Sequence, residues 1–405
     1  MRILLLSDTT MNVDAGGISQ TLYNVFSFIE VENILCIAPD WQFETYPPTE
    51  PFSSRYITYK FEIIKSPKNR LGKYIAPFAN WFNYSFNRLF RKFNKIQKQI
   101  TAFDPDVVVS CPNGPVGAFM HFKLLSGLKV KKVIPYFMDD WMCHLNLKWV
   151  GGDIHHTIKK ILTDNRTWLM ISNELAEIVG KRYEATPIHL LELHNPVDLS
   201  NAPEVLPVGK KDAYTIAYAG ALWPMHYDSF KIVANAVHKL QAKRNVSLVL
   251  YSPIGFWEWR KQELEPLGVI YGGNIPYQDI HSKLAQADAL LLVSSFLKEF
   301  YSHSRGSLQT KITDYLKAKR LIISCGPAYS ANHNFLKKHD CGICIETDDI
   351  ESVTSQLNDV LNNIDANQRL VANGWDLLVS EFTFPTVHKK LKDFLSKSME
   401  GLTVS

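Results

Sequence analysis

The feature that most constrains the fold is the regular return of short runs rich in Val, Ile and Leu, separated by stretches with helical spacing of apolar residues. Short apolar runs of this kind are typical of strands buried on both faces of a parallel sheet, so their alternation with helices predicts an α/β protein. The first set of expected strands comprises Ile3–Leu6, Ile34–Ala38, Asp106–Ser110, Lys132–Phe137, Trp168–Ile171 and Ile188–Leu193. The second set comprises Tyr214–Ala219, Val246–Tyr251, Val269–Tyr271, Ala289–Val293, Leu321–Ser324 and Gly342–Ile345.

A chain of 405 residues is too long for one ordinary hydrophobic core. The two sets of strands therefore predict two Rossmann-like parallel-sheet domains facing a cleft, and residues 199–213, which lack an apolar pattern, read as the linker. The expected boundaries are an N-terminal domain over 1–198, a C-terminal domain over 214–380, and a C-terminal helix over 381–405 that packs back toward the N-terminal domain. Expected helices near this end are Ile350–Asn362 and Pro385–Ser396.

Composition excludes several classes of protein. The sequence contains no run of about 18 uncharged apolar residues, so no membrane span is expected. Asp8 ends the first apolar run too early for a signal peptide. The six cysteines are scattered, as in proteins of a reducing cytosol. Cys341 and Cys344 have CxxC spacing, but without a second pair or a histidine cluster they are expected to be structural thiols rather than zinc ligands. A net charge of +4 is too small to imply a nucleic-acid partner.

Residues 65–98 contain no acidic residue and many lysines, arginines and aromatics. The apolar residues at helical spacing are Phe78, Phe82, Phe86, Leu89, Phe93, Ile96 and Ile100. Their aromatic and basic flanks are Trp81, Tyr84, Arg88, Arg91, Lys92, Lys95 and Lys98. One interpretation is a basic amphipathic helix that contacts an anionic membrane surface through residues 65–100. The other is a long core helix whose opposite face is solvated.

The stretch from Ser304 to Ser324 places small polar residues, a lysine and an aspartate before an apolar strand. Residues with hydroxyls that suit the start of a helix are Ser307, Thr310 and Thr313. Lys311, expected in the first helical turn, adds a positive charge where the helix dipole alone favours an acid, so it suggests a strongly anionic ligand such as a diphosphate. Asp314 is suited to accept hydrogen bonds from a ribose diol. The alternative is an ordinary amphipathic helix that buries Ile312, Tyr315 and Leu316.

Two further loops follow expected strands. Gly16 and Gly17 form a glycine turn between a strand and the helix expected over Ile18–Ile29, where backbone can approach a ligand closely. Asp139 and Asp140 follow the strand that ends at Phe137, where they are placed to act as acid and base, to bind sugar hydroxyls, or to cap a helix. Neither a GxGxxG fingerprint nor a P-loop is present, so dinucleotide or ATP binding is poorly supported.

The order of these motifs resembles that of the group 1 glycosyltransferases of family 4, which have the GT-B fold. In that family the glycine loop corresponds to Gly16–Gly17 and the His-Asp element to Asp139–Trp141. The remaining matches, in chain order, are Ile171–Leu175 with S-x-x-L, His194–Asp198 with N-[G/P]-V-D, Tyr218–Gly220 with Y-x-G, Tyr271–Pro276 with the nucleobase loop, Ala287–Ser295 with A-D-v-x-v-x-P-S, and Ser304–Ser324 with the nucleotide-binding helix. The resemblance covers nearly the whole chain.

Three departures from the family pattern mark this chain as a divergent member. The first acid of the E-x7-E pair is replaced by Gly306, so this acid is either missing or supplied by Glu299, while Asp314 takes the place of the ribose-binding acid. The basic pair after Y-x-G is replaced by Ala221 and His226, so Lys311 and Arg305 are the candidates for stabilising a diphosphate leaving group. The N-domain histidine is replaced by Met138 or Asp139.

The resemblance implies a cytoplasmic enzyme, peripheral at the inner face of the membrane in the first interpretation of residues 65–100. It moves a sugar from a UDP-, GDP- or other NDP-sugar, bound by the C-terminal domain, to a glycan or lipid-linked acceptor bound by the N-terminal domain beside Gly17 and the two aspartates. Retention of configuration and no obligatory metal are expected. The expected catalytic residues are Asp139, Asp140 and His226. The expected donor-binding residues are Gly16, Gly17, Gly220, Asn274, Ile275, Glu299, Arg305, Ser307, Thr310, Lys311 and Asp314. Two alternatives remain: a catalytically silent GT-B scaffold that binds glycan or a partner, and a GT-B sugar-nucleotide epimerase.

Overall fold

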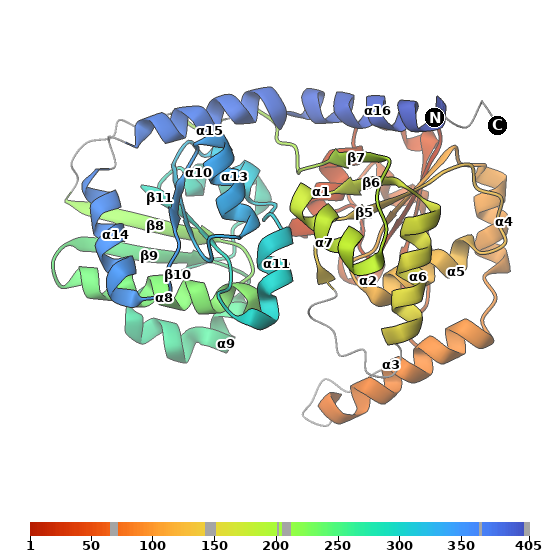
Figure 1. The fold of residues 1–405 in the computed structure, drawn as a ribbon, viewed down its shortest axis with the longest axis horizontal. Coiled ribbons are helices and arrows are strands. Elements are labelled where there is room, and N and C mark those ends of the chain that lie inside the picture. Colours follow the sequence, from red (N-terminus) through yellow and green to blue (C-terminus); the bar gives the residue numbers. More distant parts are fainter. Residues whose placement is uncertain (65–71, 142–150, 201, 205–211, 364–366, 401–405) are drawn as a thin grey trace. The chain divides into compact units, whose positions relative to one another are not determined.

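The computed structural model describes residues 1–64, 72–141, 151–200, 202–204, 212–363 and 367–400. Contacts within the chain divide it into two compact units (Figure 1). Unit 1 comprises Met1–Leu193 together with the chain from His388 onward, and unit 2 comprises His194–Val387. Each unit contains one parallel sheet covered by helices.

The sheet of unit 1 has seven strands in the order β3-β2-β1-β4-β5-β6-β7, and every neighbouring pair is parallel. The order reverses between β1 and β4, which makes this point the topological switch of the sheet. The strands are β1 (Ile3–Ser7), β2 (Ile34–Pro39), β3 (Tyr56–Tyr59), β4 (Val107–Cys111), β5 (Val133–Phe137), β6 (Thr167–Met170) and β7 (His189–Glu192).

The sheet of unit 2 has six parallel strands in the order β10-β9-β8-β11-β12-β13, with its switch between β8 and β11. Its core is formed by the buried strand residues and by the apolar faces of α8 and α14. The strands are β8 (Ala213–Ala219), β9 (Asn245–Tyr251), β10 (Val269–Gly273), β11 (Ala289–Val293), β12 (Leu321–Cys325) and β13 (Ile343–Ile345).

Helices connect the strands in both units. Those that begin in unit 1 are α1 (Gly17–Phe26), α2 (Asp40–Thr45), α3 (Gly72–Leu89), α4 (Asn94–Phe103), α5 (Pro115–Leu125), α6 (Gly151–Asp164) and α7 (Asn173–Tyr183). Those that begin in unit 2 are α8 (Pro224–Gln241), α9 (Ile254–Leu264), α10 (Ile280–Leu284), α11 (Tyr301–Gly306), α12 (Ile312–Lys317), α13 (Ala331–His339), α14 (Ile350–Asn362), α15 (Gln368–Glu381) and α16 (Phe384–Glu400). Among the described residues, no helix combines the length and apolarity needed to cross a bilayer.

The expected strands all form. The central strands β1, β4, β11 and β12 are buried at every residue, as their continuous apolar runs predict. The sequence did not predict β3, whose first three residues are partly or fully exposed at the sheet edge. Three helices, α2, α6 and α15, were also not predicted. Helix α1 ends at Phe26 rather than at Ile29.

The prediction of a single helix through residues 78–100 is wrong. The chain forms α3 and α4 with a break between them, while residues 65–71 lie outside the described part. Phe93 lies seven residues after Phe86, so one continuous helix would place both rings on the same face. Phe86 is half-buried, whereas Phe93 and Ile100 are buried. The break therefore lets the apolar residues of α4 turn into the core.

Helix α16 begins in unit 2 and continues in unit 1. In unit 1, His388 Nε2 donates to the carbonyl oxygen of Asn24 over 2.8 Å, and the His388 ring lies 4.8 Å from that of Phe28. These contacts tie the last helix to α1 and to the residues that follow it.

Candidate functional site

The candidate donor site is built at the switch point of the unit 2 sheet, where the paired strands β8 and β11 end. Open parallel sheets bind ligands at such points, beyond the carboxyl ends of their strands. Gly220 follows β8 with φ 126°, a conformation that residues with a side chain rarely adopt. Ser294 follows β11, and its hydroxyl accepts a hydrogen bond from Asn332 Nδ2 over 3.0 Å. Backbone and small side chains thus line this edge of the sheet.

Lys311 adds a positive charge at this edge of the sheet. Its Nζ lies 3.6 Å from the centre of the Tyr218 ring, and a Cβ atom added to Gly220 would lie 3.1 Å from the same Nζ. Burial lowers the pKa of the Lys311 ammonium well below its ordinary value, and no carboxylate offsets this effect within the described residues. Lys311 is half-buried. A partly desolvated cation with no carboxylate beside it among the described residues is suited to bind an anionic ligand.

Tyr218 links Lys311 to His226. The face of its ring lies under the Lys311 ammonium, and its hydroxyl lies 3.4 Å from His226 Nδ1. Tyr315 fixes the end of β8, because its hydroxyl accepts from Ala219 N over 2.9 Å and donates to the Leu291 carbonyl oxygen over 3.2 Å. The structure therefore brings together Gly220, His226 and Lys311 from the sequence-based set. The sequence analysis did not assign a site role to Tyr218, although it lies in the Y-x-G motif.

The helix after Lys311 differs from expectation. Helix α12 has only six residues, Lys311 is at its N-cap position rather than in its first turn, and no side chain caps it. Thr313 Oγ1 instead donates to the Thr310 carbonyl oxygen over 3.3 Å. Asp314 is buried and accepts a hydrogen bond from His281 Nε2 over 2.9 Å. One oxygen of the carboxylate expected to bind ribose is therefore already engaged within the protein.

The other expected donor-binding residues of unit 2 lie in the segments that follow β10 and β11. Asn274, which is exposed, and Ile275, which is half-buried, follow β10. Glu299 is exposed in a short 3-10 turn after β11, and Arg305 Nη1 lies 3.4 Å from the Tyr301 hydroxyl in α11. Two hydroxyl residues lie between α11 and α12: Ser307, which is buried, and Thr310, which is half-buried.

In unit 1, the two expected catalytic aspartates have different environments. Asp139 is half-buried after β5, whereas only 2% of Asp140 is exposed. Both oxygens of Asp140 accept hydrogen bonds from Arg182 of α7, Oδ1 from Nη1 over 2.5 Å and Oδ2 from Nη2 over 2.6 Å. A bidentate pair of this kind holds α7 against the loop after β5. Each Asp140 oxygen accepts one hydrogen bond from Arg182 and keeps a second lone pair, so the acid/base role expected for Asp140 stays a prediction.

The switch point of the unit 1 sheet contains a titratable pair that the sequence analysis missed. Asp8, directly after β1, accepts a hydrogen bond from Asn113 N over 2.7 Å, and its Oδ1 lies 3.7 Å from His121 Nε2. Burial raises the pKa of the Asp8 carboxyl to about 7 and lowers that of His121 to about 3. Gly117 leaves room for this carboxylate, since a Cβ there would lie 1.8 Å from Asp8 Oδ2. The position of Asp8 at the end of the first strand was the available signal.

The glycine turn expected over Gly16–Gly17 forms at the same edge of unit 1. Both residues have positive φ, 68° and 53°, and Gly17 is the first residue of α1. A Cβ at either position would meet no atom within 4 Å, so backbone conformation rather than space favours glycine here.

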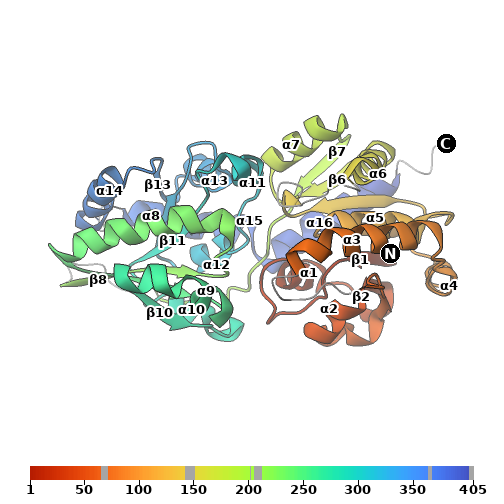
Figure 2. The ribbon, with the colours of Figure 1, turned by 90° about the horizontal axis from the view of Figure 1, so that it is seen from below.

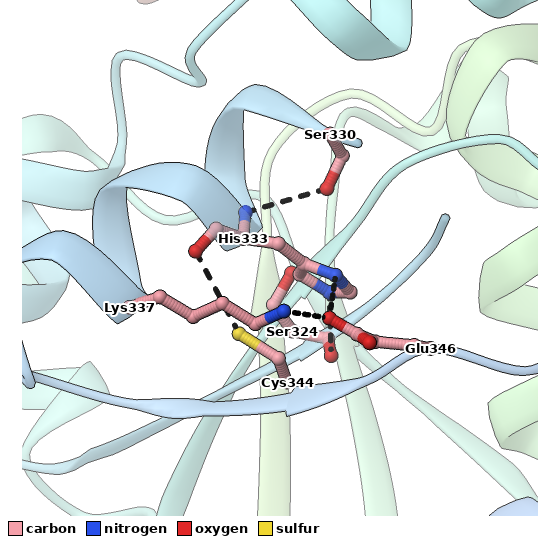
Figure 3. A network of polar contacts seen from close by, with 6 residues as sticks. All are labelled: Ser324, Ser330, His333, Lys337, Cys344 and Glu346. Atoms are coloured by element: carbon pink, nitrogen blue, oxygen red, sulfur yellow. Dashed lines mark hydrogen bonds and ion pairs between the residues drawn. The ribbon is translucent and has the colours of Figure 1, made fainter. Parts of the chain in front are cut away.

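A buried polar network occupies another part of unit 2 (Figure 3). His333 is fully buried in α13, where its Nε2 donates to the Ser324 carbonyl oxygen over 3.1 Å. Its Nδ1 lies 3.7 Å from Glu346 Oε1, which also pairs with Lys337, and Ser330 caps the helix through His333 N. Burial lowers the pKa of His333 to about 4, so this imidazole is neutral in the folded protein at physiological pH.

We expect His333 to make unit 2 less stable in mild acid. Its pKa rises from about 4 to an ordinary value near 6.5 on unfolding, so the unfolded chain takes up a proton first. The stability that neutral His333 contributes is fully present above pH 6.5 and is lost as the pH falls toward 4. This loss lowers the free energy of unfolding by about 3 kcal/mol. Urea titrations at pH 7 and pH 5 should show a smaller decrease in unfolding free energy for His333→Gln than for the wild type. Equal decreases would contradict this assignment.

Metal and thiol chemistry find little support among the described residues. In those ranges, no group of three or more His, Cys, Asp or Glu side chains is arranged to hold a metal ion. Burial raises the pKa of Cys341 to about 12 and that of Cys344 to about 11, so both remain thiols at neutral pH. The expectation that no metal is required stays a prediction.

Comparison with known proteins finds similarity in structure only. No family model matches the sequence, and no curated protein matches it. HepE of Anabaena in complex with UDP superposes with a TM-score of 0.68 at 11% identity, covering 98% of this chain and 100% of HepE. Sucrose-phosphate synthase from Thermosynechococcus elongatus gives 0.69 at 11% identity over 99% and 100% of the two chains. A glycosyltransferase from Rickettsia africae gives 0.67 at 12% identity over 98% of each. This chain is therefore an α/β protein with two Rossmann-like domains in the GT-B fold.

Proposed function

We propose that this chain is a glycosyltransferase that moves a sugar from a nucleoside diphosphate sugar to a glycan or lipid-linked acceptor. The observation that carries the proposal is the Lys311 ammonium, held beside Gly220 and over Tyr218 at the switch point of unit 2 without a carboxylate in the described residues. A diphosphate supplies the missing negative charge. The structures of HepE with UDP and with UDP-glucose, on the same fold, favour a nucleotide sugar as the source of that diphosphate.

Unit 2 binds the donor in this proposal. Lys311 neutralises the diphosphate as its bond to the anomeric carbon breaks, which lowers the free energy of the transition state. His226, coupled to Lys311 through Tyr218, lies beside the leaving group. Asp314 accepts from the ribose with the oxygen that His281 does not use. The remaining donor contacts are assigned to Asn274, Ile275, Glu299, Arg305, Ser307 and Thr310, together with the Gly16–Gly17 backbone.

Unit 1 binds the acceptor through the edge of its sheet. We assign this role to Asp139 and Asp8, which follow β5 and β1, and to the backbone beside Gly17. Asp8, with a carboxyl pKa near 7, is able to hold or release a proton close to neutral pH. The resemblance to family 4 supports transfer with retention. It also supports a role in the biosynthesis of surface polysaccharides or glycoconjugates, in the cytoplasm or at the inner face of the membrane.

A thermal-shift screen tests the donor. UDP, GDP, TDP and CMP sugars, each at millimolar concentration, are compared with adenosine and with free hexoses. The cognate donor should stabilise the protein by about 2.7 kcal/mol when present at a hundred times its dissociation constant, because it binds only the folded state. A nucleoside without phosphate should give a much smaller shift, since it lacks the group that Lys311 receives. Failure of every nucleoside diphosphate and its sugars to raise the melting temperature would contradict the proposal.

A further inference from the structure

Helix α3 of unit 1 has its amphipathic faces reversed relative to an ordinary surface helix. Its inward face carries two buried asparagines. Asn83 Oδ1 accepts from the backbone N–H groups of Ile63 and Ile64 over 2.8 and 2.9 Å, and Asn87 Nδ2 donates to the Phe61 carbonyl oxygen over 2.9 Å. Tyr84, also buried, packs on Phe119 of α5 with ring centres 4.4 Å apart. These contacts fix which face of α3 is turned to the protein.

The outward face of α3 is apolar and largely aromatic. Phe78 is 48% exposed, Trp81 40% and Leu89 70%, and Phe90 directly after the helix is 70% exposed. Its rings follow one another along the helix, with centres 6.4 Å apart for Phe78–Phe82, 6.1 Å for Phe82–Phe86 and 5.7 Å for Phe86–Phe90. Figure 1 shows α3 at the lower margin of unit 1, and Figure 2, seen from below, shows it in front of that unit. A row of exposed apolar side chains of this length marks an interaction surface.

The sequence that contains α3 is rich in cations. Residues 65–98 include no Asp or Glu. Lys92, Lys95 and Lys98 are exposed just after α3. Arg88 pairs with Asp153 of α6, so it is less available to an external anion than the three lysines. Aromatic and aliphatic side chains beside exposed cations complement a lipid surface that is apolar below its headgroups and negatively charged at them.

We propose that the exposed face of α3 inserts into the surface of a membrane that contains anionic lipids. This face, here called the α3 face, consists of Ile75, Phe78, Trp81, Phe82, Phe86, Leu89 and the adjoining Phe90. Helix α4 is excluded from it, because Phe93 and Ile100 are buried. The proposal extends the proposed function, since a lipid-linked acceptor is presented at a membrane. Its readout, however, is lipid binding alone.

Vesicle flotation with the full chain tests the α3 face. Binding to vesicles of phosphatidylcholine with about 30% phosphatidylglycerol, an anionic lipid, is compared with binding to vesicles of phosphatidylcholine alone. The variant Phe78→Ser/Trp81→Ser/Leu89→Ser should lower the partition coefficient at least about tenfold, because three inserted side chains become polar. The matched control is Ile254→Ser/Trp259→Ser/Leu297→Ser, which alters equally exposed apolar residues of unit 2 and should bind vesicles as the wild type does.

The electrostatic part has a separate variant. Lys92→Glu/Lys95→Glu/Lys98→Glu should reduce binding to anionic vesicles severalfold, with little further loss when salt is added, because the attraction that salt screens is already gone. Thermal shift by nucleotides in the same variants should match the wild type, which separates failure of lipid binding from failure of donor binding. Absence of wild-type flotation at low salt would overturn the proposal. So would a concentration-dependent dimer that the α3-face variant abolishes, since the face would then bind a second copy.

Discussion

Lys311→Met is expected to weaken binding of a nucleoside diphosphate about a hundredfold, because it removes a charge-assisted contact that contributes about 2–3 kcal/mol to binding. The same substitution should not lower the melting temperature. The Lys311 ammonium is desolvated in the folded protein and its pKa is lowered, so the free protein bears a cost for keeping it charged. Methionine fills similar space over the Tyr218 ring without that cost. Isothermal titration calorimetry and differential scanning calorimetry measure the two effects separately.

Lys319→Met is the matched control for this experiment. Lys319 also places its Nζ over an aromatic ring, 3.8 Å from the centre of Trp375, but it follows α12 at the end away from Gly220. Its substitution should leave nucleotide affinity within about twofold, well below the tenfold that 1.4 kcal/mol represents. Equal affinities of the wild type and Lys311→Met would contradict the donor site, whatever the melting temperatures are.

The pKa of Lys311 adds a second observable. Because burial lowers this pKa in the free protein and a bound diphosphate raises it again, donor binding should take up protons, increasingly so as the pH rises. Affinity should accordingly fall with rising pH. Titrations in buffers of different ionisation enthalpy measure the uptake directly. It should be absent in Lys311→Met and retained in Lys319→Met.

Apolar runs predicted the strands well, because a strand buried on both faces needs a continuous apolar run and few other structures do. This pattern missed β3, a short strand with the sequence YITY in which only Tyr59 is buried. Helical spacing has a different weakness. It shows that residues share a face, but not whether that face is buried, and in α3 the two buried asparagines satisfy the backbone of residues 61–64 while the rings lie outside.

The candidate site was predictable where its chemistry is local. Lys311 stood out because a cation at a loop-to-helix junction needs an anion, and Gly220 because its motif ends a strand. The partners of the acids were not predictable in this way. Arg182 is 42 residues from Asp140 and His281 is 33 residues from Asp314, so only the folded chain shows that these carboxylates are engaged. Asp8 was overlooked because its significance depends on His121 and Gly117, which the fold brings to the end of β1.

Asp140→Asn tests whether the Asp140–Arg182 pair is structural, and it is expected to destabilise unit 1 by about 3 kcal/mol. Asparagine offers one acceptor in place of two, and it leaves the guanidinium, only 25% exposed, without a counter-charge. The double variant Asp140→Leu/Arg182→Met should regain most of the lost stability, because replacing both members by apolar groups removes the unpaired charge. Chemical denaturation of the wild type, Asp140→Leu, Arg182→Met and the double variant gives the coupling energy between the two residues.

The control is Asp164→Asn, which removes an exposed pair with Lys160 on α6 and should cost less than about 1 kcal/mol. Nucleotide affinity should be unchanged in Asp140→Asn, because the proposed diphosphate contact is made by Lys311 in the other unit. A catalytic Asp140 would give the opposite pattern, with wild-type stability, intact donor binding and loss of transfer that the double variant does not restore. Each Asp140 oxygen bonded to Arg182 keeps a second lone pair, so denaturation and transfer assays on the same variants decide between the structural and the catalytic role.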